Sequence, residues 1–285
     1  MLKQRVITAL VLLAVLLPAL FYESPLPFCG IALLLIAAGA WEWGRLNGCA
    51  QGVALAFASV CIAACAVSWW LGLLTQSLPL LWSLAGSAWV LVAAWLLRGG
   101  VAAWSLYPRW LRLISGLVVL WLAWLAVAQA RFIGINFLLS ILALVWAADI
   151  FAYFAGRAFG GSFSRGKLAP SISPGKSWEG VWGGMIGVLA LALFWRWVDT
   201  HWAIGVPSLY THLGRAGWLL FLIALVFMAA MSVAGDLIES LVKRSAGVKD
   251  SSGLLPGHGG VLDRVDALLP TLPLALMLYA ALGPK

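Results

Sequence analysis

The class of this protein is decided by residues 111–130, which read Leu111-Arg-Leu-Ile-Ser-Gly-Leu-Val-Val-Leu-Trp-Leu-Ala-Trp-Leu-Ala-Val-Ala-Gln-Ala130. The segment contains a single charged residue, Arg112, close to its beginning. An α-helix of about 20 residues rises about 30 Å, which is the thickness of the hydrocarbon core of a bilayer. The segment is therefore predicted to be a transmembrane helix.

Comparable segments extend from it in both directions. Counted from the N-terminus, the candidates are residues 6–22, 27–44, 52–73, 78–97, 111–130, 132–156, 177–198, 216–241 and 262–283. Pro270 and Pro273 interrupt the last of them, which transmembrane helices tolerate when neighbours satisfy the freed carbonyls. Lys3 and Arg5 precede the first segment as in a signal peptide, but no small-residue cleavage site follows, so a retained helix is expected.

The composition of the whole chain agrees with these segments. Of 285 residues, 64% are hydrophobic and 10% are charged, and the mean hydropathy is +1.01. A soluble domain has about 25% charged residues, so this chain could not cover itself with a water-compatible surface. We predict an all-α integral membrane protein with about nine transmembrane helices in a lipid bilayer. The net charge of +8 needs no nucleic acid to explain it, because the inner leaflet is anionic.

Short loops with Lys and Arg predict the orientation, because such loops stay in the cytoplasm. With the N-terminus inside, fourteen of the 18 basic residues fall on the inner side: Lys3, Arg5, Arg45, Arg98, Arg109, Arg112, Arg157, Arg165, Lys167, Lys176, Lys243, Arg244, Lys249 and Arg264. The outer side holds Arg131, Arg196, Arg215 and Lys285. This distribution predicts that the C-terminus lies outside.

Residues 1–131 show no constellation of residues to which chemistry can be attached. Glu42 and Arg45 are three residues apart at the inner end of the second helix and are expected to form a local pair. The four cysteines lie in or beside apolar segments without a metal-binding spacing. We therefore expect a transmembrane scaffold of five helices here, which could serve lipid access or form the surface of a homodimer.

Residues 132–285 differ because acids recur at inner helix ends beside two basic, glycine-rich loops, 157–176 and 245–261. The acids are Asp149, Asp236, Glu239, Asp263 and Asp266. A carboxylate inside a bilayer is costly unless it is neutralised. Local pairs, such as Glu239 with Lys243 or Asp263 with Arg264, would neutralise one or two of them. A divalent cation together with a polyanionic substrate would balance the acids and the bases at once.

Hard oxygen ligands without histidine or cysteine favour Mg²⁺, which is held by a few carboxylates and by substrate phosphates. The basic residues of both loops suit phosphate oxygens. Pro174 after Ser173 has the pattern of an N1 proline behind an N-cap, which would begin the seventh helix and create an anion site beside Lys176. These features together predict metal-assisted phosphoryl or nucleotidyl transfer at the cytosolic face.

Two tempting features carry less weight. Residues 161–167, Gly-Ser-Phe-Ser-Arg-Gly-Lys, fit the first seven positions of a P-loop, but Leu168 stands where a Ser or Thr is required. His258 is flanked by glycines, and it can be either a general base or a hydrogen-bonding residue of a hinge.

The segment from Ser240 to Asp266 resembles the signature of the phosphatidate cytidylyltransferases, or CDP-diacylglycerol synthases. It contains Lys243-Arg244, Lys249-Asp250, Pro256-Gly-His-Gly-Gly260 and Asp263-Arg-Val-Asp266 at the spacing of that signature. Residues 149–156, 173–180 and 235–240 resemble the other conserved blocks of the family. The resemblance covers about residues 145–270, whereas the N-terminal half is similar only in hydropathy.

The resemblance implies that CTP and phosphatidic acid give CDP-diacylglycerol and pyrophosphate with Mg²⁺, at a site on the cytosolic face of the inner membrane. Loops 157–176 and 245–261 would be the two catalytic loops. The predicted catalytic residues are Asp236, Asp263 and Lys249. The predicted metal ligands are Asp236, Asp263, Asp266 and Asp149, and the surplus of carboxylates leaves room for a second, monovalent cation. Phosphate groups would contact Lys176, Ser177, Lys243, Arg244, Arg264, Gly257, His258, Gly259 and Gly260.

Three other functions share part of this pattern of acids and bases in a membrane protein. A CTP-dependent lipid kinase would use similar residues to phosphorylate a lipid alcohol. CDP-alcohol phosphotransferases are disfavoured because their paired-aspartate signature is absent. A transporter would place its acids near the midplane and would show an internal repeat, neither of which the sequence has.

Overall fold

The computed structural model describes residues 2–164 and 166–283. Arg165 and Lys285, which were used to predict the orientation, lie outside the described residues, as does the side chain of Lys3.

Within the described ranges, nine helices are long and apolar enough to cross a membrane. Eight of them are single elements: α1 (Leu2–Phe21), α2 (Leu26–Leu46), α3 (Gln51–Trp70), α4 (Pro79–Leu106, with a kink described below), α5 (Arg109–Ile133), α6 (Ile135–Phe159), α7 (Trp178–His201) and α9 (Trp218–Ser245). The ninth is formed by α10 (Leu262–Val265) and α11 (Leu268–Leu282), and α8 (Leu209–Arg215) is a short addition. The predicted all-α membrane architecture is confirmed.

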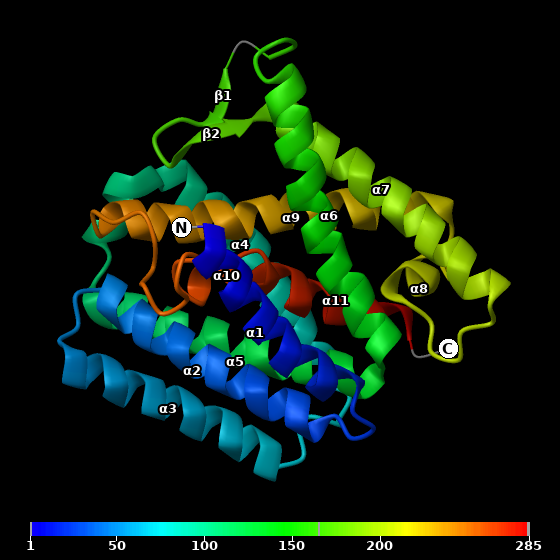
Figure 1. Ribbon diagram of the computed structural model, residues 1–285, viewed down its shortest axis with the longest axis horizontal. Coiled ribbons are helices and arrows are strands. Elements are labelled where there is room, and N and C mark those ends of the chain that lie inside the picture. Colours follow the sequence, from blue (N-terminus) through cyan, green and yellow to red (C-terminus); the bar gives the residue numbers. More distant parts are fainter. Residues whose placement is uncertain (1, 165, 284–285) are drawn as a thin grey trace.

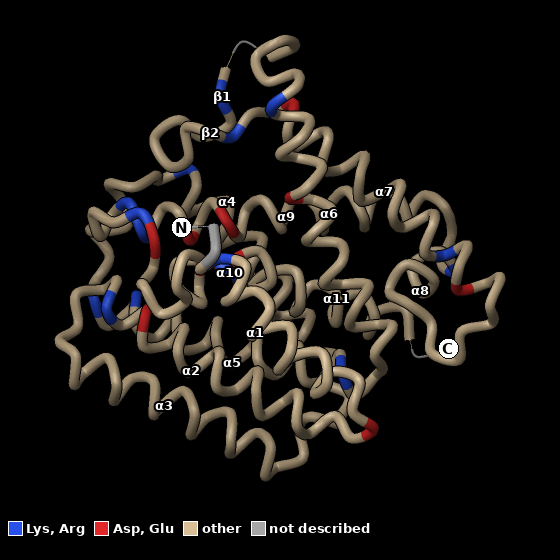
Figure 2. Tube along the Cα trace, in the orientation of Figure 1, with Lys and Arg blue, Asp and Glu red and all other residues tan. Residues whose placement is uncertain are grey.

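Helix α9 runs across the molecule, above the group of α2, α3 and α5 in the view of Figure 1. It contacts α4, α7 and α11, while α2, α3 and α5 pack as a group on one side and α6 pairs closely with α7 on the other. Figure 2 shows charged residues mainly at helix ends and in loops, with long uncharged stretches between them. The central position of α9 is what places its polar residues within reach of several helices.

Helix α4 extends beyond the predicted end at residue 97 and is broken within that extension. Gly100 has φ 69° and ψ −171°, a conformation that is essentially restricted to glycine. The turn after Gly100 brings Trp104 against Trp43 of α2, with ring centroids 5.8 Å apart. A local measure of hydropathy could not show this break, because the residues after Gly100 remain apolar.

The predicted start of the seventh helix at Pro174 is wrong. Residues Ser173–Ser177 form strand β2, which pairs antiparallel with β1 (Lys167–Ala169). Ser177 is the actual N-cap of α7, since its Oγ accepts a hydrogen bond from the backbone N–H of Gly180 at 3.2 Å. Pairing with β1 keeps the chain extended through Ser177, and Pro174 is tolerated at the edge of so short a sheet.

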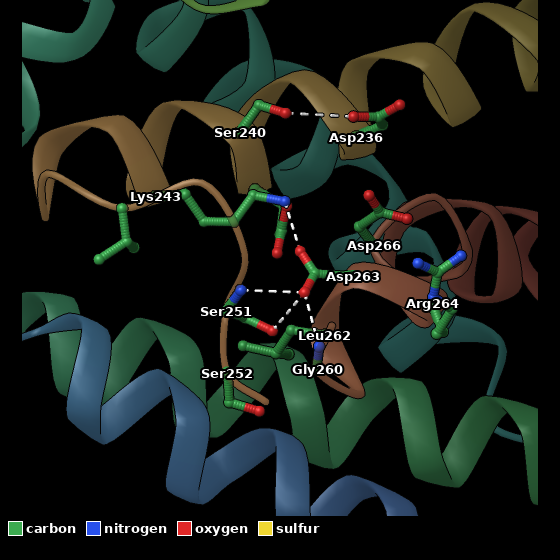
Figure 3. A network of polar contacts seen from close by, with 12 residues as sticks. Asp236, Ser240, Lys243, Ser251, Ser252, Gly260, Leu262, Asp263, Arg264 and Asp266 are labelled. Atoms are coloured by element: carbon green, nitrogen blue, oxygen red, sulfur yellow. Dashed lines mark hydrogen bonds and ion pairs between the residues drawn. The ribbon is translucent and has the colours of Figure 1, made fainter. Parts of the chain in front are cut away.

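Helices α9 and α11 approach closely because Gly235 has no side chain. A Cβ at this position would lie 2.6 Å from the carbonyl oxygen of Asp266 and 2.8 Å from Cγ of Pro270. The last membrane-spanning helix is interrupted between α10 and α11, where it crosses α9. Asp263 and Asp266 lie on the side that faces α9 (Figure 3).

Candidate active site

Lys243 on α9 is the centre of the polar network. Its ammonium group forms an ion pair with Glu239, one turn earlier on the same helix, and a second ion pair with Oδ1 of Asp263 at 2.5 Å. Figure 3 shows Lys243 reaching from α9 toward Asp263 on α10. The local pair expected between Glu239 and Lys243 is therefore present, whereas Asp263 pairs with Lys243 rather than with Arg264.

The second oxygen of Asp263 holds the loop that precedes α10. Oδ2 accepts hydrogen bonds from the backbone N–H of Ser251 at 2.9 Å, from the Ser251 hydroxyl at 2.9 Å and from the backbone N–H of Gly260 at 2.7 Å. Both oxygens of this carboxylate are thus engaged. In this structure Asp263 shapes the loop and orients Lys243. Its predicted role as a metal ligand stays a prediction.

Glu42 holds the same loop from the opposite side, and its predicted local pair with Arg45 is wrong. The Glu42 side chain is fully buried and accepts a hydrogen bond from the Ser252 hydroxyl at 2.5 Å. The Ser251 hydroxyl lies 3.1 Å from Glu42 Oε2 and shares its single proton between Glu42 and Asp263. Glu42 also accepts from the backbone N–H groups of Val261 at 2.9 Å and Leu262 at 2.8 Å. A buried carboxylate needs such donors, and the folded loop supplies them.

Arg45, three residues later, donates instead to the carbonyl oxygen of Cys49 at 2.9 Å. Glu42 could have been noticed in the sequence, because an acid inside a predicted membrane helix calls for partners just as the acids of the C-terminal half do. The arginine three residues away was a sufficient local partner by sequence, so distant partners of Glu42 were not predicted.

The glycines of residues 256–260 serve the shape of this loop. Gly257 and Gly259 have φ of 76° and 82°, which allows a tight turn closed by a hydrogen bond from the Leu255 N–H to the Gly259 carbonyl at 2.8 Å. Gly260 is required for another reason, because a Cβ there would lie 2.0 Å from the Ser251 hydroxyl and 2.4 Å from Glu42 Oε1. The predicted contact of these glycines with phosphate stays a prediction.

A polar cavity of about 530 Å³ lies beside α9, between α6, β2 and α7. Asp149 of α6, Lys176 and Ser177 of β2 and Asp236 of α9 all line it. The ammonium group of Lys176 pairs with Asp236 at 2.6 Å. The structure thus brings four of the predicted site residues to one cavity, although they are up to 87 positions apart in the sequence (Asp149 to Asp236).

The carboxylates near this cavity offer oxygen ligands of the kind that Mg²⁺ prefers. Asp266 experiences the negative charges of both Asp236 and Asp149, and Asp149 makes no hydrogen bond or ion pair with any residue that the structure describes. In the described chain no three acidic, histidine or cysteine residues form a ready-made metal cluster. Asp149, Asp236 and Asp266 are three carboxylates, and within the described ranges one base, Lys176, forms an ion pair with one of them. To bind one cation together, their side chains would have to move closer to one another.

Two of the predicted phosphate-binding bases, Arg264 and Arg244, donate to backbone carbonyl oxygens of the loops. Arg264 donates to the carbonyl oxygen of His258 through Nε, at 3.0 Å, and through Nη2, so it braces the loop. Arg244 donates to the carbonyl oxygens of Ile172 at 3.4 Å and Val248 at 3.2 Å and so links the two loops.

The side chains of Lys249 and His258 form no hydrogen bond or ion pair with an acid of the described chain. Lys249 lies exposed on its loop and forms no ion pair with a described residue. His258 has a buried Nδ1 with no hydrogen-bond partner in the described chain, while its backbone participates in the turn. Neither of the two roles expected for this histidine is decided by these contacts.

The first loop is anchored by a second glutamate that sequence reasoning missed. Glu179 of α7 accepts three hydrogen bonds at Oε1, from the backbone N–H groups of Phe163 at 3.1 Å and Ser164 at 2.7 Å and from the Ser164 hydroxyl at 2.8 Å. Lys167, the last position of the P-loop-like sequence, donates to the carbonyl oxygen of Pro174 at 2.8 Å. This sequence follows the end of α6 and runs into β1, so it does not have the strand-to-helix context of a P-loop.

The geometry can now be compared with known proteins. A family model described as "Cytidylyltransferase family" matches residues 3–282. The chain belongs to the cytidylyltransferase family. This match extends across both halves of the molecule, which agrees with the contacts between Glu42 and the loop of the signature.

This chain is similar to several proteins named phosphatidate cytidylyltransferase. It is 40% identical over 292 residues to a phosphatidate cytidylyltransferase of Pseudomonas aeruginosa, covering 99% of this chain and 98% of the relative. It is 38% identical over 299 residues to the protein of that name from Haemophilus influenzae, covering 98% of this chain and 99% of the relative. A similarly named protein of Thermotoga maritima is 40% identical over 145 residues, about half of each chain. The predicted family is confirmed.

Proposed function

We propose that this protein transfers the cytidylyl group of CTP to phosphatidic acid, giving CDP-diacylglycerol and pyrophosphate for phospholipid biosynthesis. The proposal is carried by one observation. Asp236, which lines the polar cavity, and Lys243, which pairs with Asp263 of α10, both lie on α9, in a chain whose full-length relatives are named phosphatidate cytidylyltransferases.

The reaction needs no covalent enzyme intermediate. An oxygen of the lipid phosphate attacks the α-phosphorus of CTP, and the bond from that phosphorus to the oxygen leading to the β-phosphate breaks, so that pyrophosphate leaves. The protein must hold two polyanions close together and offset their charge. Lys176 and Lys243 are the bases already oriented by carboxylates in this structure, and Ser177 lines the same cavity.

Mg²⁺ is part of the proposal. Asp149, Asp236 and Asp266 would hold it, with Asp263 joining if substrate releases its present partners. The bound ion would offset charge on the triphosphate and polarise the reacting phosphate. A second, monovalent cation would balance the remaining carboxylates. We also propose the inner membrane as the location, with the N-terminus and the active site facing the cytosol; homodimerisation stays a prediction.

The purified protein with labelled CTP, phosphatidic acid and Mg²⁺ tests the reaction. We expect labelled CDP-lipid and unlabelled pyrophosphate when the label is in the cytidine, and no product with EDTA. A lipid kinase would instead leave labelled CDP and phosphorylate a lipid alcohol, and that result would refute the proposal.

The residue roles are tested separately. Asp263→Asn should abolish turnover without loss of membrane insertion, because the amide would turn an N–H toward Lys243 or toward the three donors at Oδ2. Asp149→Asn should raise the Mg²⁺ concentration needed for half-maximal rate. If Asp263→Asn kept a rate near wild type at limiting Mg²⁺, its assignment to the active site would be wrong.

A further inference from the structure

Helix α1 holds the turn of residues 255–259 by two side-chain hydrogen bonds. The hydroxyl of Thr8 donates to the carbonyl oxygen of Pro256 at 2.9 Å. Nε of Arg5 donates to the carbonyl oxygen of Gly257, also at 2.9 Å. A Cβ on Gly257 would lie 2.9 Å from Cγ of Arg5. The N-terminal end of α1 therefore lies directly beside the loop that precedes α10 (Figure 1).

The contact between α1 and the turn is polar and is confined to the inner end of the helix. Only 11% of the membrane-spanning window of α1 is buried against the rest of the protein. Its large apolar side chains, such as Val6, Ile7 and Leu10, are exposed and would face lipid in a bilayer. Thr8 is half-buried, because it faces the turn. An otherwise exposed helix thus directs two donors at one short stretch of backbone.

The peptide group that joins Pro256 to Gly257 has a single hydrogen-bond partner in the described chain. Its carbonyl oxygen accepts from Thr8, whereas the N–H of Gly257 donates to no described residue. The next peptide group is held at both ends, by Arg5 at its oxygen and within the turn at its N–H. Among the described residues, Thr8 is therefore the one that fixes the plane of the first peptide group.

A glycine makes this peptide group easy to turn over. Gly257 has φ 76°, and without a Cβ its φ can change sign at little cost. The peptide group is planar, so turning it over would exchange the directions of its carbonyl oxygen and its N–H. The N–H of the exposed Gly257 is a donor that suits a phosphate oxygen, whereas a carbonyl oxygen in its place would repel one. The hydroxyl of Thr8 decides which of the two groups is presented.

The turn adjoins the polar network of the candidate active site. A Cβ on Gly259 would lie 2.7 Å from Oδ2 of Asp263, and the N–H of Gly260 donates to the same oxygen at 2.7 Å. Asp263 pairs in turn with Lys243 of α9. The free N–H of Gly257 therefore lies two residues from a glycine that contacts this network.

We propose that Thr8 is a positioning residue of the reaction. Its hydroxyl holds the turn so that the N–H of Gly257, and not the preceding carbonyl, meets a phosphate oxygen of a substrate, and Arg5 anchors α1 at the next carbonyl. The assignment rests on the proposed function. The phosphate belongs either to CTP or to phosphatidic acid. In this role α1 acts through the backbone of the turn and contributes no group to the reaction itself.

Thr8→Val tests the positioning role, because valine keeps the shape of the side chain and lacks the hydroxyl. We expect the KM for one substrate, CTP or phosphatidate, to rise about five-fold, the size expected for one hydrogen bond, and the other KM to stay within about two-fold. The substrate whose KM rises is the one whose phosphate meets Gly257. Thr8→Ser keeps the hydroxyl and should restore the wild-type KM. Thr200→Val is the matched control, because the hydroxyl of Thr200 donates to carbonyl oxygens of its own helix.

Amide hydrogen exchange tests the same contact without turnover. The N–H of His258 donates to the carbonyl oxygen of Leu255 at 2.8 Å and closes the turn. In the absence of substrates, its exchange should be about five-fold faster in Thr8→Val than in the wild type. Exchange in Thr8→Ser and Thr200→Val should equal that of the wild type. Thermal unfolding in detergent should have the same midpoint in all four proteins.

The outcomes separate the positioning role from the proposed function. If the wild type forms no CDP-lipid, the proposed function fails, and unchanged exchange in Thr8→Val would separately show that Thr8 does not fix the turn. If the wild type is active but neither KM rises in Thr8→Val, or both rise equally, the positioning role is overturned. A loss of the same size in Thr8→Ser or Thr200→Val would also overturn it, because the effect would then come from the helix and not from the hydroxyl.

Discussion

Glu42 and Glu179 each hold one loop through a buried carboxylate, but they use their oxygens differently. Glu42 accepts two hydrogen bonds at Oε1 and two at Oε2, where the Ser251 hydroxyl is shared with Asp263. Glu179 accepts all three of its side-chain hydrogen bonds at Oε1, and its buried Oε2 has no partner within the described ranges. The amide of glutamine has one oxygen and one N–H₂ group, so the two sites should respond differently to the same substitution.

Glu42→Gln should impair the enzyme strongly. Whichever way it is turned, the amide N–H₂ group would face one backbone N–H, of Val261 or of Leu262, and leave that buried donor unsatisfied at a cost of about 1–3 kcal/mol. We expect at least about a ten-fold loss of turnover and faster proteolysis between residues 248 and 260, with the helical circular dichroism unchanged. Glu23→Gln, at an exposed turn, is the matched control. Normal turnover and normal protection of the loop in Glu42→Gln would contradict this role.

Glu179→Gln should be tolerated, because the amide oxygen can take the place of Oε1 and the N–H₂ group the place of the unpartnered Oε2. Glu179→Ala removes the acceptor for three donors and should release residues 160–166 from α7. Tryptic cleavage at Lys167, followed over time, should be accelerated in the alanine variant and not in the glutamine variant. Equal cleavage of the two variants would show that Glu179 does not hold the loop.

At the scale of elements, the segment of α4 after the break at Gly100 lines an apolar cavity of about 460 Å³ between α4, α5 and α9. The segment after Gly100 packs Trp104 with Ile172 of the first loop and with Leu237 and Leu241 of α9 in a small buried cluster. One glycine conformation therefore helps to position a loop, the central helix and a wall of the apolar cavity.

Gly100→Ala should destabilise this arrangement. A Cβ at φ 69° and ψ −171° is strained by about 1–3 kcal/mol, so we expect a lower midpoint of thermal unfolding in detergent and lower activity. Gly52→Ala is the control, because Gly52 is helical and a Cβ there meets nothing within 4 Å. A Gly100→Ala protein as stable and active as Gly52→Ala would show that the break is not needed.

At the scale of the whole molecule, the predicted orientation can be tested with little background. The four native cysteines are all buried, so an impermeant maleimide should not label the wild type. Gly205 and Gly253 are both exposed, and an added Cβ meets nothing within 4 Å at either position. Gly205→Cys and Gly253→Cys therefore form a matched pair on the two predicted sides of the membrane.

We expect Gly205→Cys to be labelled in cells whose inner membrane is intact. Gly253→Cys should be labelled only after that membrane is permeabilised, because loop 245–261 is predicted to be cytosolic. The reverse pattern would invert the orientation and place the active site on the outer side, where cytosolic CTP could not reach it.

The halves of the molecule are more interdependent than their hydropathy suggests. Besides Glu42, the guanidinium of Arg5 donates to the carbonyl oxygen of Gly257 at 2.9 Å, and the hydroxyl of Thr8 donates to that of Pro256 at 2.9 Å. Helices α1 and α2 thus contact the loop of the signature directly. The separation into a scaffold of residues 1–131 and a catalytic unit of residues 132–285 stays a prediction, and these contacts connect the two.

The sequence by itself determined the membrane class, the nine spanning segments and the family. Each of these depends on local information: the length of an apolar run is compared with the thickness of a bilayer, and the signature between Ser240 and Asp266 is continuous in the chain. It also named Lys176, Asp236, Lys243 and Asp263, which the fold then brought to one helix and its surroundings.

Only the tertiary structure decided how these groups are paired. Glu42 meets its donors 209 to 220 positions later in the chain, and the start of α7 is set by pairing with β1 and not by Pro174. The apolar cavity exists only where α4, α5 and α9 converge. A carboxylate in an apolar environment requires hydrogen-bond donors. The sequence does not show which distant backbone groups will supply them, because this depends on how the helices pack.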